Sequence, residues 1–187
     1  MKLLDPNALI VVTGAGGFIG GHLIAKLRSQ GYHHLRAVDI KPLKQWYQHY
    51  DNVDNQVLDL TVRENCRVAV QDSQYVFNLA SDMGGMGFIE AHKALCMLAV
   101  LINTQMLISA REAGVERFFY SSSACVYAAQ KQAATIMPAL REDDAYPAMP
   151  EDGYGWEKLF SERMCRHFSE DFGLITRVGR YHNVYGP

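Results

Sequence analysis

The sequence has no excess of charge of either sign: its 187 residues include 18 Lys and Arg against 20 Asp and Glu. Proteins that bind nucleic acid or acidic polymers usually carry a basic surface, so this balance gives no support to such a partner. The sequence also lacks an uninterrupted apolar run of the ~20 residues needed to cross a bilayer, and its first residues lack the apolar stretch of a signal peptide. We therefore expect no nucleic-acid partner and no membrane partner.

Cysteine is scarce and shows no pairing pattern. The four cysteines, at positions 66, 96, 125 and 165, form no C-x-x-C pair and no metal-ligand spacing with the histidines. We expect no metal site, and a reducing, cytoplasmic location. Internal repeats, low-complexity tracts and linkers are missing too. This leaves one domain over residues 1–187, whose 49% apolar residues suffice for a substantial core.

Strand-like and helix-like segments alternate along the chain. Strands are expected at 8–13, 35–39, 56–58, 75–80, 117–121 and 174–178, and helices at 18–30, 61–71, 89–113 and 154–172. Such alternation is typical of βαβ units, and the continuously apolar first strand is typical of a sheet covered on both faces. We predict an α/β fold, a Rossmann-type doubly wound parallel sheet with helices on both faces. The proline-containing segment 127–153 is expected to lie over the site as a loop.

A glycine-rich turn joins the first expected strand to the first expected helix. Gly14, Gly17 and Gly20 are spaced G-x-x-G-x-x-G, and the same turn contains Gly16, Phe18 and Ile19. Glycines at this place permit a tight turn and let backbone amides at the helix N-terminus approach a pyrophosphate. The motif indicates a dinucleotide site, although an ordinary glycine-rich βα turn has the same pattern.

An acidic residue at the end of the second strand strengthens the dinucleotide interpretation. Asp39 follows Gly20 by 19 residues, where a carboxylate can accept hydrogen bonds from ribose hydroxyls and repel a 2′-phosphate. This favours NAD over NADP, with Lys41 as the feature that could soften the preference. Further cofactor contacts are expected at other strand ends, where turn-forming residues are an alternative explanation. These contacts are Asp59, Leu60, Leu79 and Ala80.

A tyrosine and a lysine four residues apart on an expected helix suggest a proton-transfer site. Tyr154 and Lys158 share one helix face, and a neighbouring ammonium favours the phenolate and lowers the tyrosine pKa. A half-buried tyrosine beside a surface lysine is the ordinary structural alternative. The serine run 121–123 at the end of the fifth strand argues against that alternative, because a hydroxyl there can hydrogen-bond a substrate oxygen opposite the tyrosine.

Three stretches carry a resemblance to a known family: 77–89 with its Met-Gly-Gly-Met-Gly sequence, 118–127 with Ser-Ala-Cys, and 177–187, which ends in Asn-Val-Tyr-Gly-Pro. With the glycine turn and the Tyr-x-x-x-Lys pair, they make the chain similar to the extended short-chain dehydrogenase/reductase superfamily of nucleotide-sugar epimerases and dehydratases. Within that superfamily it most resembles the GDP-mannose 3,5-epimerases. The superfamily resemblance covers essentially the whole chain.

The resemblance implies NAD as cofactor, a nucleotide sugar such as GDP-mannose as substrate, and a role for each catalytic residue. Tyr154 would take the proton of the sugar C4 hydroxyl, Lys158 would hold the nicotinamide ribose, and Ser123 would orient the C4 oxygen. Cys125 would exchange protons at C3 or C5, which become acidic once C4 is a ketone; a thiol is suited to this near neutral pH. A small buried hydrophobe is the alternative for Cys125. The sugar would contact Gly84, Met86, Gly87, Ser123 and Asn183.

The family pattern continues past the end of this chain, with a second acid/base lysine and most of the nucleotide-sugar pocket. We therefore expect a chain in which the C-terminal substrate-binding region is absent. Alternatives are a UDP-sugar 4-epimerase, a nucleotide-sugar 4,6-dehydratase, or a non-catalytic NAD-binding module. The resemblance also implies a homodimer formed through the two long helices, 89–113 and 154–172.

Overall fold

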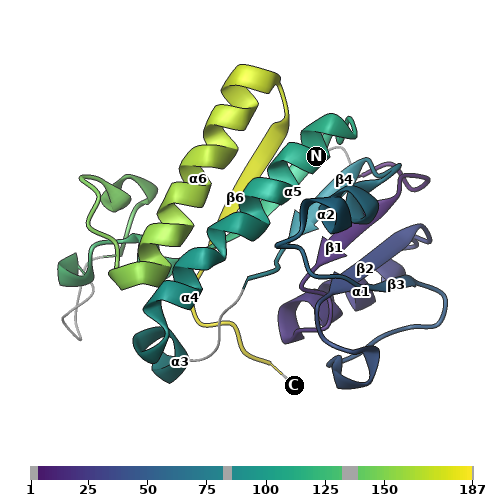
Figure 1. Ribbon diagram of the computed structural model, residues 1–187, viewed down its shortest axis with the longest axis horizontal. Coiled ribbons are helices and arrows are strands. Elements are labelled where there is room, and N and C mark those ends of the chain that lie inside the picture. Colours follow the sequence, from purple (N-terminus) through teal and green to yellow (C-terminus); the bar gives the residue numbers. More distant parts are fainter. Residues whose placement is uncertain (1–3, 82–85, 132–138, 187) are drawn as a thin grey trace.

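The computed structural model describes residues 4–81, 86–131 and 139–186. Six strands form one parallel sheet in the order β3-β2-β1-β4-β5-β6 (Figure 1). The strands are β1 Ile10–Thr13, β2 Leu35–Asp39, β3 Asp54–Val57, β4 Tyr75–Asn78, β5 Arg117–Ser123 and β6 Ile175–Tyr181. The order reverses between β1 and β4, and at such a switch point the carboxyl ends of the strands leave a crevice. The predicted doubly wound sheet is confirmed.

The helices connect these strands. They are α1 Phe18–Ser29, α2 Arg63–Val70, α3 Met86–Ala91, α4 Lys93–Leu98, α5 Val100–Glu112 and α6 Asp152–Phe172, with short 3₁₀ turns η1 Leu43–Gln45, η2 Ala124–Val126, η3 Ala129–Lys131 and η4 Glu142–Ala145. In Figure 1, α4 and α5 run end to end beside the long α6, in front of the sheet.

Alternation along β1 explains why helices cover both faces of the sheet. Ile10 and Val12 belong to one buried cluster, which includes Ile24 and Leu27 of α1. Val11 belongs to a second cluster, which contains apolar residues of α2, α5 and α6. Successive side chains of a strand point to opposite faces, so a strand buried on both sides is apolar throughout.

The structure corrects several expected boundaries. The expected helix 89–113 is divided into α3, α4 and α5, because His92 leaves helical geometry (φ −128°, ψ 45°) and Ala99 separates α4 from α5. The fifth and sixth strands run further than expected, to Ser123 and Tyr181, which pair with each other. Serines are tolerated in β5 because they find partners: the buried Ser122 hydroxyl donates to Glu162 Oε1 at 2.5 Å.

The stretch Lys93–Glu112 is 20 residues long and, by length and composition alone, could cross a membrane. Such a stretch was not expected, because the sequence has no uninterrupted apolar run of ~20 residues. A core helix of a soluble protein passes the same test, and one side of this stretch packs into the buried cluster through Ile102, Met106 and Leu107. Its other side carries exposed apolar side chains, among them Leu95, Leu98 and Leu101.

Candidate active site

A cavity of about 940 Å³ opens at the carboxyl ends of the central strands. Its wall brings together the glycine turn, the end of β5, the start of α6 and the segment after β6. The lining residues are Gly14, Gly17, Phe18, Ile19, Gly20, Leu79, Ser81, Ile89, Ser121, Ser122, Ser123, Ala124, Cys125, Glu151, Tyr154, Lys158, Tyr181, His182, Asn183 and Val184. Segments more than 160 residues apart in sequence thus share one site of a size that suits a small-molecule ligand.

The glycine turn is packed so tightly that side chains cannot replace two of its glycines. Gly14 has φ +67°, and a Cβ there would lie 2.9 Å from the carbonyl carbon of Leu79. A Cβ on Gly20 would lie 2.2 Å from the Gly14 carbonyl oxygen. Helix α1 follows this turn, with Gly17 as its N-cap and neither a side-chain cap nor an acidic residue in its described first turn. Its first amides can therefore bind an anion such as a diphosphate.

Ser81 adds a polar group to the same wall. Its Oγ is buried and has no hydrogen-bond partner among residues 4–81, 86–131 and 139–186. A buried hydroxyl without a partner is costly, so its position in the cavity indicates that a bound ligand completes its hydrogen bonding. The glycine turn, residues 14–20, forms a cradle for a diphosphate, here called the glycine cradle. Together with this cradle, the Ser81 hydroxyl fits a dinucleotide such as NAD.

Asp39 lies beside the glycine turn at the end of β2, 8% exposed. Its Oδ2 accepts from the Gly16 amide at 3.0 Å, and its Oδ1 accepts from the Lys41 amide at 3.0 Å. The indole of Trp46 covers Gly16, since a Cβ on that glycine would lie 2.8 Å from Trp46 Cδ1. Each carboxylate oxygen can still accept another bond, so the position remains compatible with ribose hydroxyls.

Five of the expected cofactor contacts are not among the residues that line the cavity: Gly16, Asp39, Asp59, Leu60 and Ala80. Asp59 accepts from the amide and hydroxyl of Thr61, which is turn chemistry. Leu60 is 4% exposed and belongs to the core cluster of α2 and α5. The Ala80 amide donates to Thr13 Oγ1 at 3.1 Å, while the adjacent Leu79 does line the cavity. Asp59 is thus well explained as a turn-forming residue at a strand end, the alternative to a cofactor contact.

Tyr154 and Lys158 lie one helical turn apart on the buried side of α6, at 5% and 2% exposure. Lys158 Nζ is 5.5 Å from the centroid of the Tyr154 ring and donates to the Ser121 carbonyl at 3.2 Å. The Ser123 hydroxyl makes a hydrogen bond with Tyr154, as a residue opposite the tyrosine should. The three side chains expected to act together therefore do converge.

The expected lowering of the tyrosine pKa is not what the protein alone produces. Burial raises the pKa of Tyr154 well above its ordinary value, and the hydrogen bond from Ser123 opposes this only in part. Burial also lowers the pKa of Lys158, against the charge of Glu157. Desolvation disfavours the charged form of each side chain, and it is the largest effect on both pKa values.

Cys125 is the middle residue of η2 and lines the same cavity. Its amide donates to Ser123 Oγ at 3.2 Å. Burial raises the pKa of the thiol; the hydrogen bond with Ser123 lowers it, and the charge of Glu151 raises it again. Cys125 therefore rests as a thiol at neutral pH rather than as a thiolate.

The substrate residues expected from the resemblance are only partly brought to the site. Ser123 and Asn183 line the cavity. Gly84 lies outside the described residues, and Met86 begins α3. Gly87, in the same short helix, has open space where a Cβ would stand and is not in the wall; Ile89 is.

Sequence reasoning missed several residues of the wall. They are Ile89, Glu151, Tyr181, His182 and Val184. Glu151 could have been found, because it precedes Tyr154 by three residues at the start of the same helix, and such a spacing puts two side chains on one face. The others lie in α3 and at or just after the end of β6, which only the tertiary fold brings to the cavity.

An ion pair behind the cavity joins three parts of the chain. Arg180 of β6 binds Glu162 of α6 in a bidentate manner, at 2.9 Å through Nε and 2.7 Å through Nη2. It also donates to Tyr127 Oη at 3.1 Å and to the Glu142 carbonyl at 2.7 Å. The segment after Cys125 is thereby tied to both β6 and α6.

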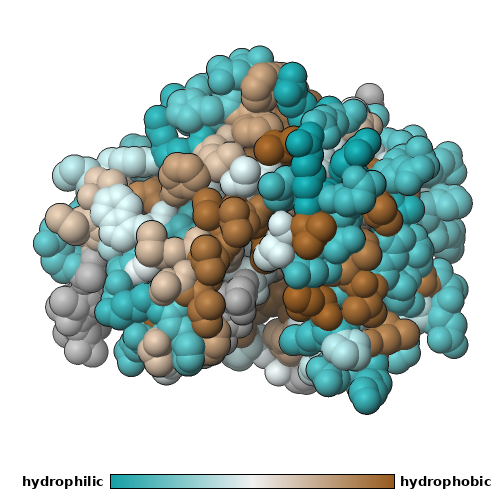
Figure 2. All heavy atoms as spheres, in the orientation of Figure 1, coloured by the Kyte–Doolittle hydropathy of each residue, from teal (hydrophilic) through white to brown (hydrophobic). Residues whose placement is uncertain are grey.

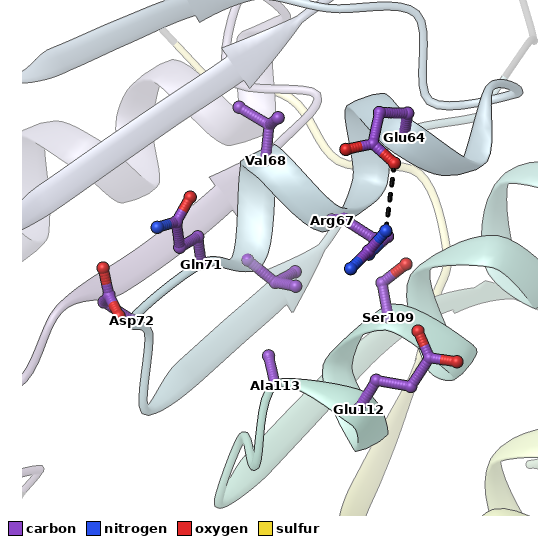
Figure 3. A pocket seen from close by; sticks show the side chains of 9 residues that line it. Glu64, Arg67, Val68, Gln71, Asp72, Ser109, Glu112 and Ala113 are labelled. Atoms are coloured by element: carbon purple, nitrogen blue, oxygen red, sulfur yellow. Dashed lines mark hydrogen bonds and ion pairs between the residues drawn. The ribbon is translucent and has the colours of Figure 1, made fainter.

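A second cavity, of about 390 Å³, lies between the ends of α2 and α5 (Figure 3). Arg67 points across it and pairs with Glu64 at 3.2 Å, while Glu112 pairs with Arg63 at 2.6 Å. Within the described ranges, no group of three or more His, Cys, Asp or Glu residues could hold a metal ion.

Comparison with known proteins agrees with this geometry. The chain is 44% identical over 182 residues to the GDP-mannose 3,5-epimerase of Arabidopsis thaliana, which covers 97% of this chain and 48% of that protein. It thus spans about half the length of the curated relative. Among solved structures it is similar to a UDP-galactose 4-epimerase, with a TM-score of 0.80, 28% identity, and coverage of 95% of this chain and 57% of that one.

A third comparison concerns a protein with bound ligands. MoeE5 in complex with UDP-glucose and NAD matches with a TM-score of 0.75 and 29% identity, over 96% of this chain and 56% of that one. Residues 10–187 match the family described as the NAD dependent epimerase/dehydratase family, which is nearly the whole sequence. With the parallel sheet, the glycine cradle and the converging Tyr154, Lys158 and Ser123 already described, this chain belongs to the NAD dependent epimerase/dehydratase family.

Proposed function

We propose that this chain is the NAD-binding and proton-transfer part of a nucleotide-sugar epimerase that acts on GDP-mannose. One observation carries the proposal: the glycine cradle and the side chains of Tyr154, Ser123 and Cys125 line one cavity. The identity to GDP-mannose 3,5-epimerase supports the choice of sugar. The cavity, the cradle and the buried Ser81 hydroxyl support NAD as the cofactor.

NAD, when bound, would supply the oxidant for C4 of the sugar and, in its oxidised form, a positive charge near Tyr154. The phenolic oxygen takes the proton of the C4 hydroxyl, and Ser123, hydrogen-bonded to Tyr154, holds that oxygen in place. Lys158 would hold the nicotinamide ribose, and its buried ammonium would contribute positive charge. Because burial raises the Tyr154 pKa, proton transfer needs both positive charges.

Cys125 acts at the carbon that inverts. A ketone at C4 makes the hydrogens on C3 and C5 acidic. The thiolate form of Cys125, in equilibrium with the thiol, takes one of these protons and leaves an enolate, and the thiol then returns a proton exchanged with solvent to that carbon. The thiol lies on the same wall as Ser123, the residue that would orient the C4 oxygen, so it is near the carbons next to C4. Asn183 and Ile89 bound the sugar on the remaining sides.

The test measures binding and exchange separately. Calorimetric titration of the chain with NAD should show one site, which Gly14→Val abolishes. GDP-mannose should then take up solvent deuterium at C3 or C5, as followed by NMR, and Cys125→Ala should stop that uptake. A change confined to C4 would identify a 4-epimerase instead. NAD binding without any change in the sugar would indicate a non-catalytic module.

We also propose that the protein forms a homodimer through α4, α5 and α6. Helices α4 and α5, end to end, both pack against α6. The outer surface of the three helices carries large exposed apolar side chains: Leu95, Met97, Leu98, Leu101, Trp156 and Phe160, which are 42–54% exposed. Figure 2 shows hydrophobic surface gathered over α4 and the neighbouring part of α6. Contiguous apolar patches of this kind mark interfaces. A second copy of the chain would cover the exposed apolar side chains of α4, α5 and α6 at once.

Analytical ultracentrifugation tests the dimer. The double variant Leu98→Glu and Phe160→Glu should sediment as a monomer under conditions where the unmodified chain is a dimer. Val68→Glu is the matched control, because Val68 is also an apolar helical residue with 41% exposure but lies on α2. A monomeric unmodified chain would overturn the proposal.

A further inference from the structure

Two buried side chains contact Lys158 from the protein interior, and the proposed chemistry uses neither of them. They are Glu157 of α6 and Tyr120 of β5, which are 3% and 1% exposed. Tyr120 Oη donates to Glu157 Oε1 at 3.2 Å, and the Ser161 hydroxyl donates to the same oxygen at 2.8 Å. The other carboxylate oxygen, Oε2, has no hydrogen-bond partner among the described residues. One oxygen of Glu157 is thus fixed by hydrogen bonds, and the second is left to interact with a charge.

That charge is the Lys158 ammonium, whose Nζ lies 3.7 Å from Glu157 Oε2. Nζ also donates to the Ser121 carbonyl oxygen at 3.2 Å and lies 4.9 Å from the centroid of the Tyr120 ring. A carboxylate, a carbonyl oxygen and the face of an aromatic ring all attract positive charge. Lys158 also lines the cavity, and an ammonium has three donors, so it can bind these groups and a ligand together.

We infer that Glu157 is a positioning residue for Lys158: its buried carboxylate holds the lysine in its charged form at the cavity wall. The inference rests on the proposed function, in which Lys158 would hold the nicotinamide ribose and supply positive charge near Tyr154. Without the carboxylate, burial would favour the neutral amine. Burial lowers the pKa of Lys158 and the charge of Glu157 raises it, so the two effects oppose each other.

The other titratable groups around Lys158 do not replace this carboxylate. They are Tyr120, Tyr154, Cys165 and, four residues along the same helix, Glu162. Burial raises the pKa of both tyrosines and of the thiol, so all three are neutral at pH 7. Glu162 is charged, but it is neutralised by its bidentate pair with Arg180. Removing the charge of Glu157 should therefore shift Lys158 toward the neutral amine.

Trace acetylation with acetic anhydride tests this on the chain alone, because the reagent reacts with neutral amines. The rate at Lys158 is followed against pH by mass spectrometry, with the exposed Lys44 as internal reference. The measurement gives the midpoint, the pH at which half of the Lys158 side chains are charged. Glu157→Gln should lower this midpoint by about one pH unit, because loss of a nearby opposite charge shifts a pKa by roughly that amount. Acetylation of Lys158 at pH 7.5 should then be about tenfold faster.

Two further variants separate the charge from loss of stability. Glu157→Asp keeps the carboxylate, so its midpoint should stay above that of Glu157→Gln. Cys66→Ala removes buried packing in α2 and no charge. It should leave the midpoint unchanged or raise it, because transiently unfolded chains titrate at the ordinary lysine pKa of about 10.4.

A midpoint in Glu157→Gln equal to that of the parent chain would overturn the inference, and so would equal shifts in the glutamine and aspartate variants. If Glu157→Gln does not fold, Glu157→Asp decides: a midpoint near that of the parent chain supports the inference, and a fall of about one unit overturns it. Because the measurement needs neither cofactor nor sugar, its failure leaves the proposed function intact. A failure of NAD binding likewise leaves the effect of Glu157 on Lys158 intact.

Discussion

Glu157 and Lys158, successive residues of α6, are both buried, and Glu157 Oε2 lies 3.7 Å from Lys158 Nζ. The other carboxylate oxygen, Oε1, accepts from Tyr120 Oη at 3.2 Å and Ser161 Oγ at 2.8 Å. The Glu157 carboxylate therefore holds the Lys158 ammonium, and the same helix places the Tyr154 side chain at the cavity wall. A charge this deeply buried requires a partner.

Glu157→Gln should destabilise the protein by about 3 kcal/mol, because it leaves the Lys158 ammonium buried without its counter-charge. Glutamine can still accept from Tyr120 and Ser161, so the loss reports the charge rather than the hydrogen bonds. Urea unfolding measures it. Glu170→Gln, on the exposed part of the same helix, should change the unfolding free energy by less than about 0.5 kcal/mol. Equal losses in the two variants would contradict the assignment.

Gly20→Ala and Gly21→Ala form a matched pair at adjacent positions of α1. A Cβ on Gly20 would lie 2.2 Å from a backbone oxygen, whereas the nearest atom to a Cβ on Gly21 is the Gln48 Cγ at 2.8 Å, which a flexible side chain can move. Gly20→Ala should therefore cost about 2 kcal/mol or more and abolish NAD binding. Gly21→Ala should be neutral or gain up to about 1 kcal/mol from helix propensity. Thermal unfolding and NAD titration check both; similar behaviour of the pair would refute the cradle geometry.

The buried cysteines predict loss of stability in alkali. Burial raises the pKa of Cys66 and of Cys165 from 9.0 to about 12. A raised pKa in the folded state gives stability that is complete below about pH 9 and is lost as the pH rises toward 12. Each thiol contributes a slope of about 1.4 kcal/mol per pH unit in that window.

Urea unfolding at pH 8, 9 and 10 measures this slope. Cys66→Ala lowers stability at every pH through lost packing, but it should also reduce the slope above pH 9 relative to the parent chain. Cys125→Ser, at a position that is only half-buried, should reduce it less. Identical slopes in the parent chain and Cys66→Ala would show that the thiol does not carry the effect.

Tyr154→Phe should separate binding from chemistry. The ring stays in place, so NAD affinity should remain within about twofold, but loss of the phenolic oxygen should reduce turnover of the sugar by about 10²- to 10⁴-fold. Calorimetry with NAD and NMR of the sugar measure the two quantities. Full turnover in this variant would remove Tyr154 from the proton-transfer role.

The sequence was sufficient for the sheet and for the placement of Tyr154 and Lys158 on one face of a helix, because both depend on local patterns. An apolar first strand, a glycine turn and residues four apart on a helix are recognisable without knowing the rest of the fold. The extent of β5 could not be predicted in this way. Its serines favour a turn locally, and only their bonds to groups distant in sequence, such as Ser122 to Glu162, keep them in the strand.

The division of the expected helix 89–113 and the environment of Tyr154 were missed for related reasons. The break at His92 is a backbone feature without a proline or glycine to mark it. The direction of the Tyr154 pKa depends on how deeply α6 is buried, and helical spacing shows which residues share a face but not how far that face is from water.

Arg180 makes one mechanical unit of parts that could otherwise move separately. Its four donated bonds reach α6, the Tyr127 side chain and the Glu142 carbonyl from the strand that leads into His182 and Asn183. A ligand that displaces residues 182–183 would therefore also displace the helix that carries Tyr154 and the segment that follows Cys125. A displacement of any one of these three segments would be shared by the other two. The side chains of Tyr154 and Cys125 would then shift together and keep their mutual spacing.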